Sequence, residues 1–296
     1  MERKQNPYLK NSDDWMALLR NEHTEEVKAE ARWPTVMLQS SARQIVWSMC
    51  SLLGVYDKGV PGSSCRLLER CLCRHIQTFL HENHSLEEFS QYKKVIVSKF
   101  FLLLVSCVQL AAKMSDLQTP MSASRVRSAL LQLGVDHSTA EIVRMESRVF
   151  GILDYRIPVW NSLETAEFLA DGVGVNSPVI IKALEVVINA TEYRRDIFEL
   201  NMKSWIAHNR PANVSPPSEE GSAVRLTMHN LHVCAAGVAA TLRYMQHPAR
   251  AAAVLALARL LPVERAYLRA MVHALLKTIF TPLEPSASGS KKKRYL

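Results

Sequence analysis

Glu146 is a carboxylate at a position where the surrounding pattern calls for an apolar side chain. On a helical projection that starts at Ile142, Val149 and Leu153 fall at about −20° and 20°, and Glu146 falls at about 40°. A carboxylate among apolar side chains is costly unless it is paired or hydrogen-bonded. Glu146 therefore either has a partner within the fold, or marks an edge where another protein supplies donors, or is simply an acid at the rim of a helix face.

Lys113 is the second residue of interest, because it closes a long apolar run. Taken alone, a cation at that place only offsets the helix dipole and keeps the helix end in water. It becomes informative only together with Glu146, which follows 33 positions later with one predicted helix between them.

Other residue clusters do not favour catalysis or metal binding. Cys71, Cys73 and His75 offer three metal ligands close in sequence. However, cysteines two positions apart on a helix point about 200° apart and cannot close one site without unwinding. The sequence has no glycine-rich phosphate loop, nucleophile elbow or metalloprotease motif. We expect no metal, no cofactor and no enzymatic activity.

The element that must position Lys113 is the apolar stretch from Phe100 to Ala112, interrupted only by Ser106 and Gln109. A helix that is apolar on every side is buried on every side. Because thirteen residues are fewer than the roughly 20 that span a bilayer, its surroundings must be protein, and no membrane is expected. The stretch predicts the central helix of a bundle.

Helices are expected on both sides of this stretch, and strand signals are nearly absent. Ser138 and Glu141 form a capping-box pattern that marks the start of the helix carrying Glu146. The segment from His84 to Gln91 is expected to be a connection, and Pro158 ends the block. The five predicted helices cover 40–56, 64–81, the central stretch, 122–133 and a segment from 138 onward.

A second helical block follows, so the fold class is all-α with two helical domains. Its small-residue centre, Ala235 to Ala240, suits close helix packing, and the Pro- and Ser-rich run from Pro211 to Ser222 predicts a loop. The predicted helices lie near 162–171, 178–201, 223–245, 248–260 and 263–280. The predicted divisions are an N-terminal extension with a short helix around Trp15 (1–38), two domains (39–158 and 159–281) and a disordered basic tail (282–296).

Net charge and cysteine content indicate whether the chain binds nucleic acid and in which cellular compartment it lies. The net charge of +8 comes from 36 Lys and Arg against 28 Asp and Glu, and four of the cations lie in the tail at Lys291, Lys292, Lys293 and Arg294. The remaining excess of four is modest, so direct DNA binding is not expected. Six cysteines without a regular framework and a polar N-terminus favour reduced thiols in cytosol or nucleus. The tail fits a nuclear-import cluster and a solvated end equally well.

Two segments resemble the cyclin box. Leu110-Ala111-Ala112-Lys113-Met114-Ser115-Asp116 is similar to the cyclin pattern L-A-[AS]-K-[FY]-E-[ED], and Met145-Glu146 with Val149, Ile152 and Leu153 is similar to M-E-x-x-[VI]-L-x-x-L. In cyclins this lysine and glutamate contact a kinase near its αC helix. The resemblance implies that Lys113 and Glu146, with Leu102 eleven residues before the lysine, are partner-binding residues.

The chain departs from the family where cyclins dock substrates. Aligning Arg43 with the family's arginine puts Ala42, Val46 and Met49 in the apolar positions, while Trp47 is out of register. The sequence therefore predicts a degenerate docking patch at best. The aspartate that pairs with this arginine in the family is replaced by Cys73. Because an unpaired buried charge is expensive, we expect Arg43 to pair with Glu69 instead.

The resemblance implies a cyclin fold, in which a cyclin box is followed by a divergent second cyclin-like domain. Among cyclins the chain looks most like atypical meiotic members. This implies a non-enzymatic regulator of crossover designation and maturation, which binds other meiotic crossover proteins on meiotic chromosomes in the nucleus, with the cytoplasm as a further location. Two alternatives stay open, namely an activating subunit of a cyclin-dependent kinase and, less favoured, a cyclin-fold nucleic-acid adaptor.

Overall fold

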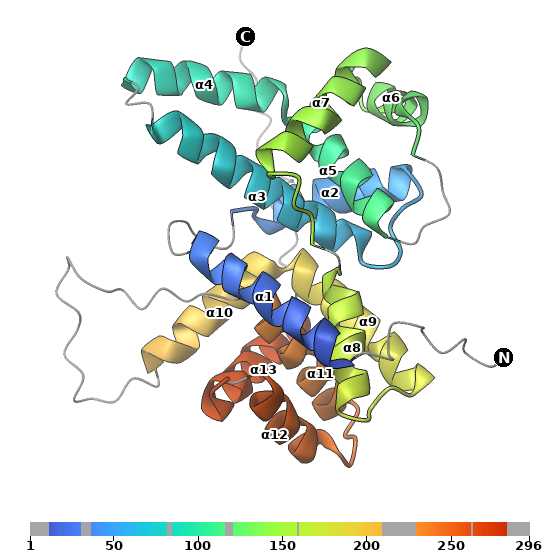
Figure 1. The fold of residues 1–296 in the computed structure, drawn as a ribbon, viewed down its shortest axis with the longest axis vertical. Coiled ribbons are helices and arrows are strands. Elements are labelled where there is room, and N and C mark those ends of the chain that lie inside the picture. The colour runs from blue at the N-terminus through green and yellow to red at the C-terminus, as the bar shows by residue number, and fades with distance from the viewer. Residues whose placement is uncertain are drawn as a thin grey trace, which may run out of the picture.

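The computed structural model describes residues 12–30, 37–81, 85–115, 121–158, 160–208, 229–261 and 263–282. These residues form α-helices joined by turns and contain no strand, which confirms the all-α prediction for this part of the chain. The helices and their bounds are α1 (Ser12–Glu30), α2 (Ser40–Leu52), α3 (Val60–His81), α4 (Leu86–Ser98), α5 (Phe100–Met114), α6 (Ala123–Gln132), α7 (Thr139–Ile152), α8 (Ser162–Gly172), α9 (Pro178–Tyr193), α10 (Arg195–His208), α11 (Asn230–Tyr244), α12 (Arg250–Leu260) and α13 (Arg265–Phe280) (Figure 1).

Helices α2, α3, α6 and α7 surround one hydrophobic core, with α5 at its centre. Every residue of α5 from Leu102 to Ala112 is buried, including the two polar residues that interrupt the apolar run. Ser106 satisfies its hydroxyl by donating to the Leu102 carbonyl at 2.7 Å. α3 and α7 provide the largest contacts with α5. The prediction of a buried central helix is confirmed.

The predicted connection from His84 to Gln91 is wrong, because most of it belongs to helix α4. Ser85 caps this helix, and the Glu88 carboxylate accepts from the Ser85 backbone N–H at 2.7 Å. Lys99 then separates α4 from α5, and the two axes differ by 55°. In Figure 1 α4 lies across the top of the molecule, where Tyr92 stacks on Phe79 of α3 at 4.0 Å between ring centroids.

Among the described residues, no single helix is long and apolar enough to cross a membrane. Only the bent pair formed by Glu87–Ser98 and Phe100–Met114 reaches that length and composition jointly.

Helices α8 to α13 form a second core around α11. The small residues at the centre of α11 are buried, and a Cβ added at Gly237 would lie 2.6 Å from Ile188 Cδ1 of α9. The predicted single helix over 178–201 is instead broken at Arg194. The break allows the buried Arg194 side chain to donate to the Thr281 carbonyl at 2.6 Å. The predicted loop from Pro211 to Ser222 lies outside the described residues.

Helix α1, which carries the Trp15 patch, packs on the second core. Met16 and Leu19 are buried among the side chains of that core. Trp15 stacks on Trp160 with 4.8 Å between ring centroids, and Arg20 Nη2 donates to the Leu260 carbonyl at 2.8 Å. Helix α1 is therefore held by the second half of the chain.

Candidate functional site

Helices α2 to α7 form the first bundle and α8 to α13 the second. Lys113 and Glu146 meet at the edge of the first bundle. Lys113 lies in the last turn of α5, and its ammonium donates to Glu146 Oε1 of α7. The Lys113 side chain is 53% exposed and that of Glu146 is 14% exposed. Of the three explanations that the sequence allows for Glu146, the geometry supports a partner within the fold. An ammonium has three N–H donors, so Lys113 retains capacity for a further acceptor at the surface.

A capping box fixes the start of α7 and thereby the position of Glu146 on the helix. Ser138 Oγ accepts from the Glu141 backbone N–H at 3.2 Å, and the Glu141 carboxylate accepts from the Ser138 backbone N–H at 2.8 Å. This predicted capping box sets the start of α7. Ile142 and Val149 then point into the core, and Glu146 comes to lie at the border of the buried face.

Apolar side chains flank the ion pair. Val143 lies one helical turn before Glu146 on α7, and Met114 follows Lys113 directly; both are exposed. Phe150, one turn after Glu146, packs edge-to-face on the exposed Tyr155 with 5.0 Å between ring centroids. The ion pair therefore lies at an edge that also exposes apolar side chains. We call Lys113, Glu146, Met114, Val143 and Phe150 the α5–α7 edge.

Leu102 does not belong to this edge. It lies three helical turns before Lys113 on the same side of α5, but it is 4% exposed and packs in the first core. The end of α5 that carries Leu102 is covered by neighbouring helices, and the role of Leu102 as a partner contact stays a prediction.

The predicted docking patch is also not a surface. Arg43, Val46 and Met49 are buried, and only Ala42 is partly exposed. These side chains share one face of α2, and that face packs against α3 and α5. Trp47 contacts Tyr193 of α9 edge-to-face at 5.3 Å. The apolar positions of α2 therefore belong to the core, and a docking role for this face stays an untested prediction.

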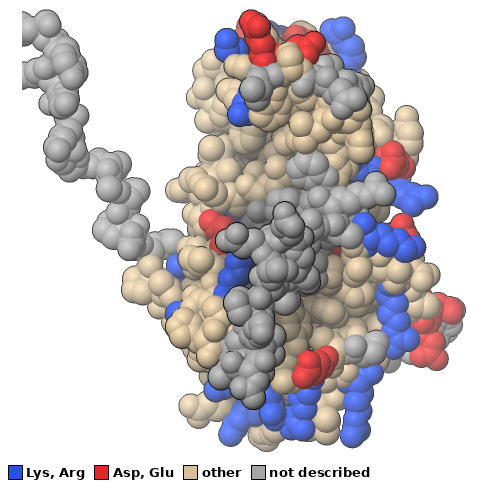
Figure 2. Space-filling model, turned by 90° about the vertical axis from the view of Figure 1, so that its left-hand side faces the viewer, with Lys and Arg blue, Asp and Glu red and all other residues tan. Residues whose placement is uncertain are grey.

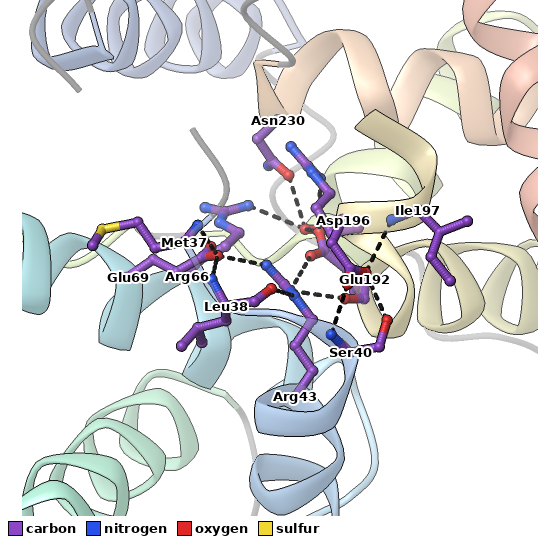
Figure 3. Close-up of polar contacts among 12 residues, drawn as sticks. Met37, Leu38, Ser40, Arg43, Arg66, Glu69, Glu192, Asp196, Ile197 and Asn230 are labelled. Carbon is purple, nitrogen blue, oxygen red and sulfur yellow. Dashed lines mark hydrogen bonds and ion pairs between the residues drawn. The ribbon is translucent and has the colours of Figure 1, made fainter. Parts of the chain in front are cut away.

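Arg43 is instead the centre of a buried polar network between the two bundles (Figure 3). Its Nη2 lies 2.7 Å from Glu69 Oε1 of α3, which confirms the predicted pairing. Its Nε donates to the Leu38 carbonyl at 3.1 Å, and its Nη1 donates to the Glu192 carbonyl of α9 at 2.8 Å. Glu69 Oε1 also accepts from the backbone N–H groups of Met37 and Leu38 at 3.0 and 2.9 Å.

Glu192 carries this network into the second bundle. Its Oε1 accepts from Ser162 Oγ at 2.6 Å and lies 3.4 Å from Arg195 Nη1. Burial raises the pKa of Glu192, but the cations of Arg195, Arg66 and Arg43 and the Ser162 hydroxyl outweigh burial and hold the pKa below its ordinary value. Glu192 is therefore held as a buried carboxylate.

The pKa of Glu69 is shifted in the opposite direction from that of Glu192. Burial dominates and raises the pKa of its carboxyl, although Arg43 and the backbone donors of Leu38 and Met37 act in the opposite direction.

A second contact between the bundles lies beside the network, where Asp196 of α10 accepts from the Ser40 backbone N–H at 2.8 Å and from the Ser40 hydroxyl at 2.6 Å (Figure 3). The network joins Arg43 and Glu69 of the first bundle to Glu192 of the second, so it is a structural joint.

The cysteines give no sign of reactivity. Among the six, only Cys73 is partly exposed, and its Sγ lies 2.8 Å from Met37 Sδ. Burial raises the pKa of Cys71 to about 11. His75 is hydrogen-bonded through Nδ1 to the Tyr92 hydroxyl at 2.6 Å. The basic cluster at Lys291, Lys292, Lys293 and Arg294 lies outside the described residues.

Comparison with known proteins agrees with the motif resemblance. Two curated proteins are similar to this chain over 132 residues: cyclin N-terminal domain-containing protein 1 of Mus musculus, at 27% identity, and the protein of the same name in Homo sapiens, at 28%. This chain resembles cyclin N-terminal domain-containing protein 1. Each match covers 42% of the chain and 40% of the relative, so the chain spans less than half the length of these relatives in the match. No protein-family model and no solved structure matches the chain.

Proposed function

We propose that this chain is a cyclin-like regulator without catalytic activity of its own, and that it binds a protein partner at the α5–α7 edge. The observation that carries the proposal is the meeting of Lys113 and Glu146 at an edge flanked by exposed apolar side chains. The similarity to cyclin N-terminal domain-containing protein 1 supports the same interpretation.

The resemblance to this atypical cyclin implies a process as well. We extend the proposal to the regulation of meiotic recombination, in which the chain acts in crossover designation and maturation by binding other crossover proteins in the nucleus. Loss of the gene is expected to reduce crossover number in meiocytes, and tagged protein is expected at recombination sites on meiotic chromosomes. Normal crossover number in the mutant would reject this part of the proposal.

A cyclin-dependent kinase is the alternative partner class. In cyclins the matching lysine and glutamate contact the kinase near its αC helix, and a kinase that accepts from Lys113 while packing on Met114 and Val143 would use the edge in the same way. The two proposals are compatible, since a crossover regulator can act through a kinase.

The test separates recognition from folding. The purified chain is mixed with a panel of purified cyclin-dependent kinases, and complexes are measured by size-exclusion chromatography. The variant Lys113→Glu with Glu146→Lys keeps an internal ion pair but reverses the charges offered to a partner, so it is expected to fold and to lose binding. The matched control removes another exposed pair of the first bundle, Arg127 and Asp136, by substitution to alanine. Binding by wild type and control alone supports kinase recognition at the edge.

Two other results have definite meanings. Equal kinase binding by the charge-reversed variant would reject the α5–α7 edge as the recognition site. Absence of binding to every kinase would reject kinase activation and leave the crossover-regulator proposal, which the meiotic experiment tests separately.

A second candidate function rests on the charge of the second bundle. Residues 229–282 carry six Lys and Arg against the single acid Glu264, and all six cations are exposed. These cations are Arg243, Arg250, Arg259, Arg265, Arg269 and Lys277. Figure 2 shows basic side chains gathered at the lower end of the molecule, where α12 and α13 lie in Figure 1. A nucleic-acid adaptor would bind duplex DNA with an affinity that falls steeply with salt; salt-independent or absent binding rejects it.

A further inference from the structure

Three metal-ligating side chains converge between α1 and the start of α11, away from the α5–α7 edge. They are His23 and Glu26 of α1 and His229, which directly precedes α11. One ligand atom from each lies within 4.8 Å of the others. A fourth group, His232 of α11, lies close by, with its ring centroid 4.7 Å from that of His23 and 5.8 Å from that of His229.

The four residues form two pairs, each spaced by three positions. His23 and Glu26 share one face of α1, and His229 and His232 follow one another by about one turn at the start of α11. This is a spacing with which helical side chains can bind a common ion. Neither pair is a site alone, and the fold brings together two segments that lie far apart in the sequence.

One nitrogen at this place lacks a hydrogen-bond partner, and the carboxylate is oriented by a backbone N–H. His23 Nδ1 is buried without a hydrogen-bond partner, which native structures rarely leave unexplained. Glu26 Oε2 accepts from the Asn230 backbone N–H at 3.1 Å, so the carboxylate is oriented by the chain next to His229. Such a contact is the kind of supporting interaction that fixes a ligand's direction in metal sites.

Burial also affects two of these histidines. Burial and the neighbouring His229 lower the pKa of His23, against a smaller opposite influence of Glu26. Burial, His23 and His229 lower the pKa of His232 to about 4.

We propose that His23, Glu26, His229 and His232 bind one divalent transition-metal ion of the zinc class. Three imidazoles and one carboxylate suit zinc and its neighbours, and they do not suit magnesium or calcium, which take oxygen ligands. Zinc–ligand bonds of about 2.0–2.2 Å place tetrahedral ligand atoms about 3.4 Å apart. The side chains must therefore close by about 1.4 Å from the present span of 4.8 Å.

Such an ion would act as a clamp. The first half of α1 is already fixed by Trp15, Met16 and Leu19, whereas most side chains after Arg20 face solvent. His23 and Glu26 are among the exceptions in this second half. Metal binding would tie the second half of α1 to α11 and so stabilise its contact with the second bundle.

The experiment uses the full chain after chelator treatment and dialysis. Zinc binding is measured by titration calorimetry, and the unfolding midpoint is recorded with and without zinc. Wild type is expected to bind one zinc per chain with micromolar or tighter affinity and to unfold at higher temperature with zinc. Cobalt substitution should give the absorption of a tetrahedral site.

The variant His23→Gln with His229→Gln is expected to lose this binding, while His273→Gln, which changes an exposed histidine of α13, should behave as wild type. Glu26→Gln keeps side-chain volume and an acceptor for Asn230, and it should weaken zinc binding about tenfold or more. This milder variant, checked by circular dichroism, covers the case in which the double variant does not fold.

The proposal fails if wild type shows no saturable zinc binding, or if Glu26→Gln and a folded double variant bind like wild type. It also fails if binding is abolished by Cys73→Ser, because the ion would then sit at the cysteines of α3.

Discussion

Arg43 Nη2 lies 2.7 Å from Glu69 Oε1 in the interior of the molecule, and the same guanidinium donates to the Glu192 carbonyl at 2.8 Å. One arginine on α2 thus connects α3 of the first bundle with α9 of the second. Because the Arg43 side chain is fully buried, no water can replace the guanidinium as a hydrogen-bond donor if the side chain is removed.

Arg43→Ala is expected to lower the free energy of unfolding by about 3–5 kcal/mol, because removing one member of a buried ion pair leaves the other charge uncompensated. Urea denaturation measures the change. Gln44→Ala, on the exposed side of the same helix, is the control and should change stability by less than about 0.5 kcal/mol. Equal stability of the two variants would contradict the role assigned to Arg43.

Glu192→Gln is expected to make stability less dependent on pH in acid. The pKa of Glu192 in the folded chain lies below its ordinary value of 4.5. The carboxylate therefore contributes stability that is fully present above about pH 4.5 and is lost as the pH falls through the folded pKa. The difference in unfolding free energy between wild type and variant should shrink over that range.

Glu69 does not disturb this comparison, because wild type and variant both contain it, although its raised pKa gives it the opposite pH dependence. A difference that stays constant from about pH 7 to about pH 3 would show that Glu192 acts by shape rather than by charge.

Gly237→Leu is expected to destabilise the second bundle by about 1–3 kcal/mol through overpacking. A Cβ at this position already lies 2.6 Å from Ile188 Cδ1, and both residues are buried. Thermal or urea unfolding measures the loss. The exchange Gly237→Leu with Ile188→Ala returns part of the space and should recover part of the stability; no recovery would argue against this contact.

Trp15→Ala is expected to loosen α1 and to cost about 1–3 kcal/mol, since the stacked contact with Trp160 and the apolar area beneath it are lost. Trp160 fluorescence should report greater access to water, and limited proteolysis should cut within α1 sooner. Val186→Ala, at an exposed position of α9, is the control for loss of apolar area. Unchanged proteolysis of α1 would mean that its attachment depends on other residues.

Local patterns predict much of the first bundle. The apolar run identifies α5, and the Ser138–Glu141 capping box marks the start of α7. The missing aspartate points to the Arg43–Glu69 pair, since a buried cation requires an acid nearby. The motif resemblance selects Lys113 and Glu146 as partner contacts, and the structure shows that these two side chains also contact each other.

The remainder depends on contacts that no local pattern records. The helix breaks at Lys99 and Arg194 carry no glycine or proline, and at Arg194 the side chain donates to the carbonyl of Thr281, which is 87 positions away. Glu192 and Arg43 are 149 positions apart. The apolar face of α2 is an ordinary amphipathic pattern that fits a docking patch and a core face equally well, and only the packing of α3 and α5 against it decides.

The attachment of α1 to the second bundle has a consequence for the order in which the chain matures. This helix leaves the ribosome well before the groups that hold it, Trp160 and the Leu260 carbonyl among them, are synthesised. Between these two moments Met16 and Leu19 have no core to enter. The apolar face of α1 therefore stays exposed while the first bundle folds. A nascent chain with exposed apolar surface binds chaperones and is prone to misassembly.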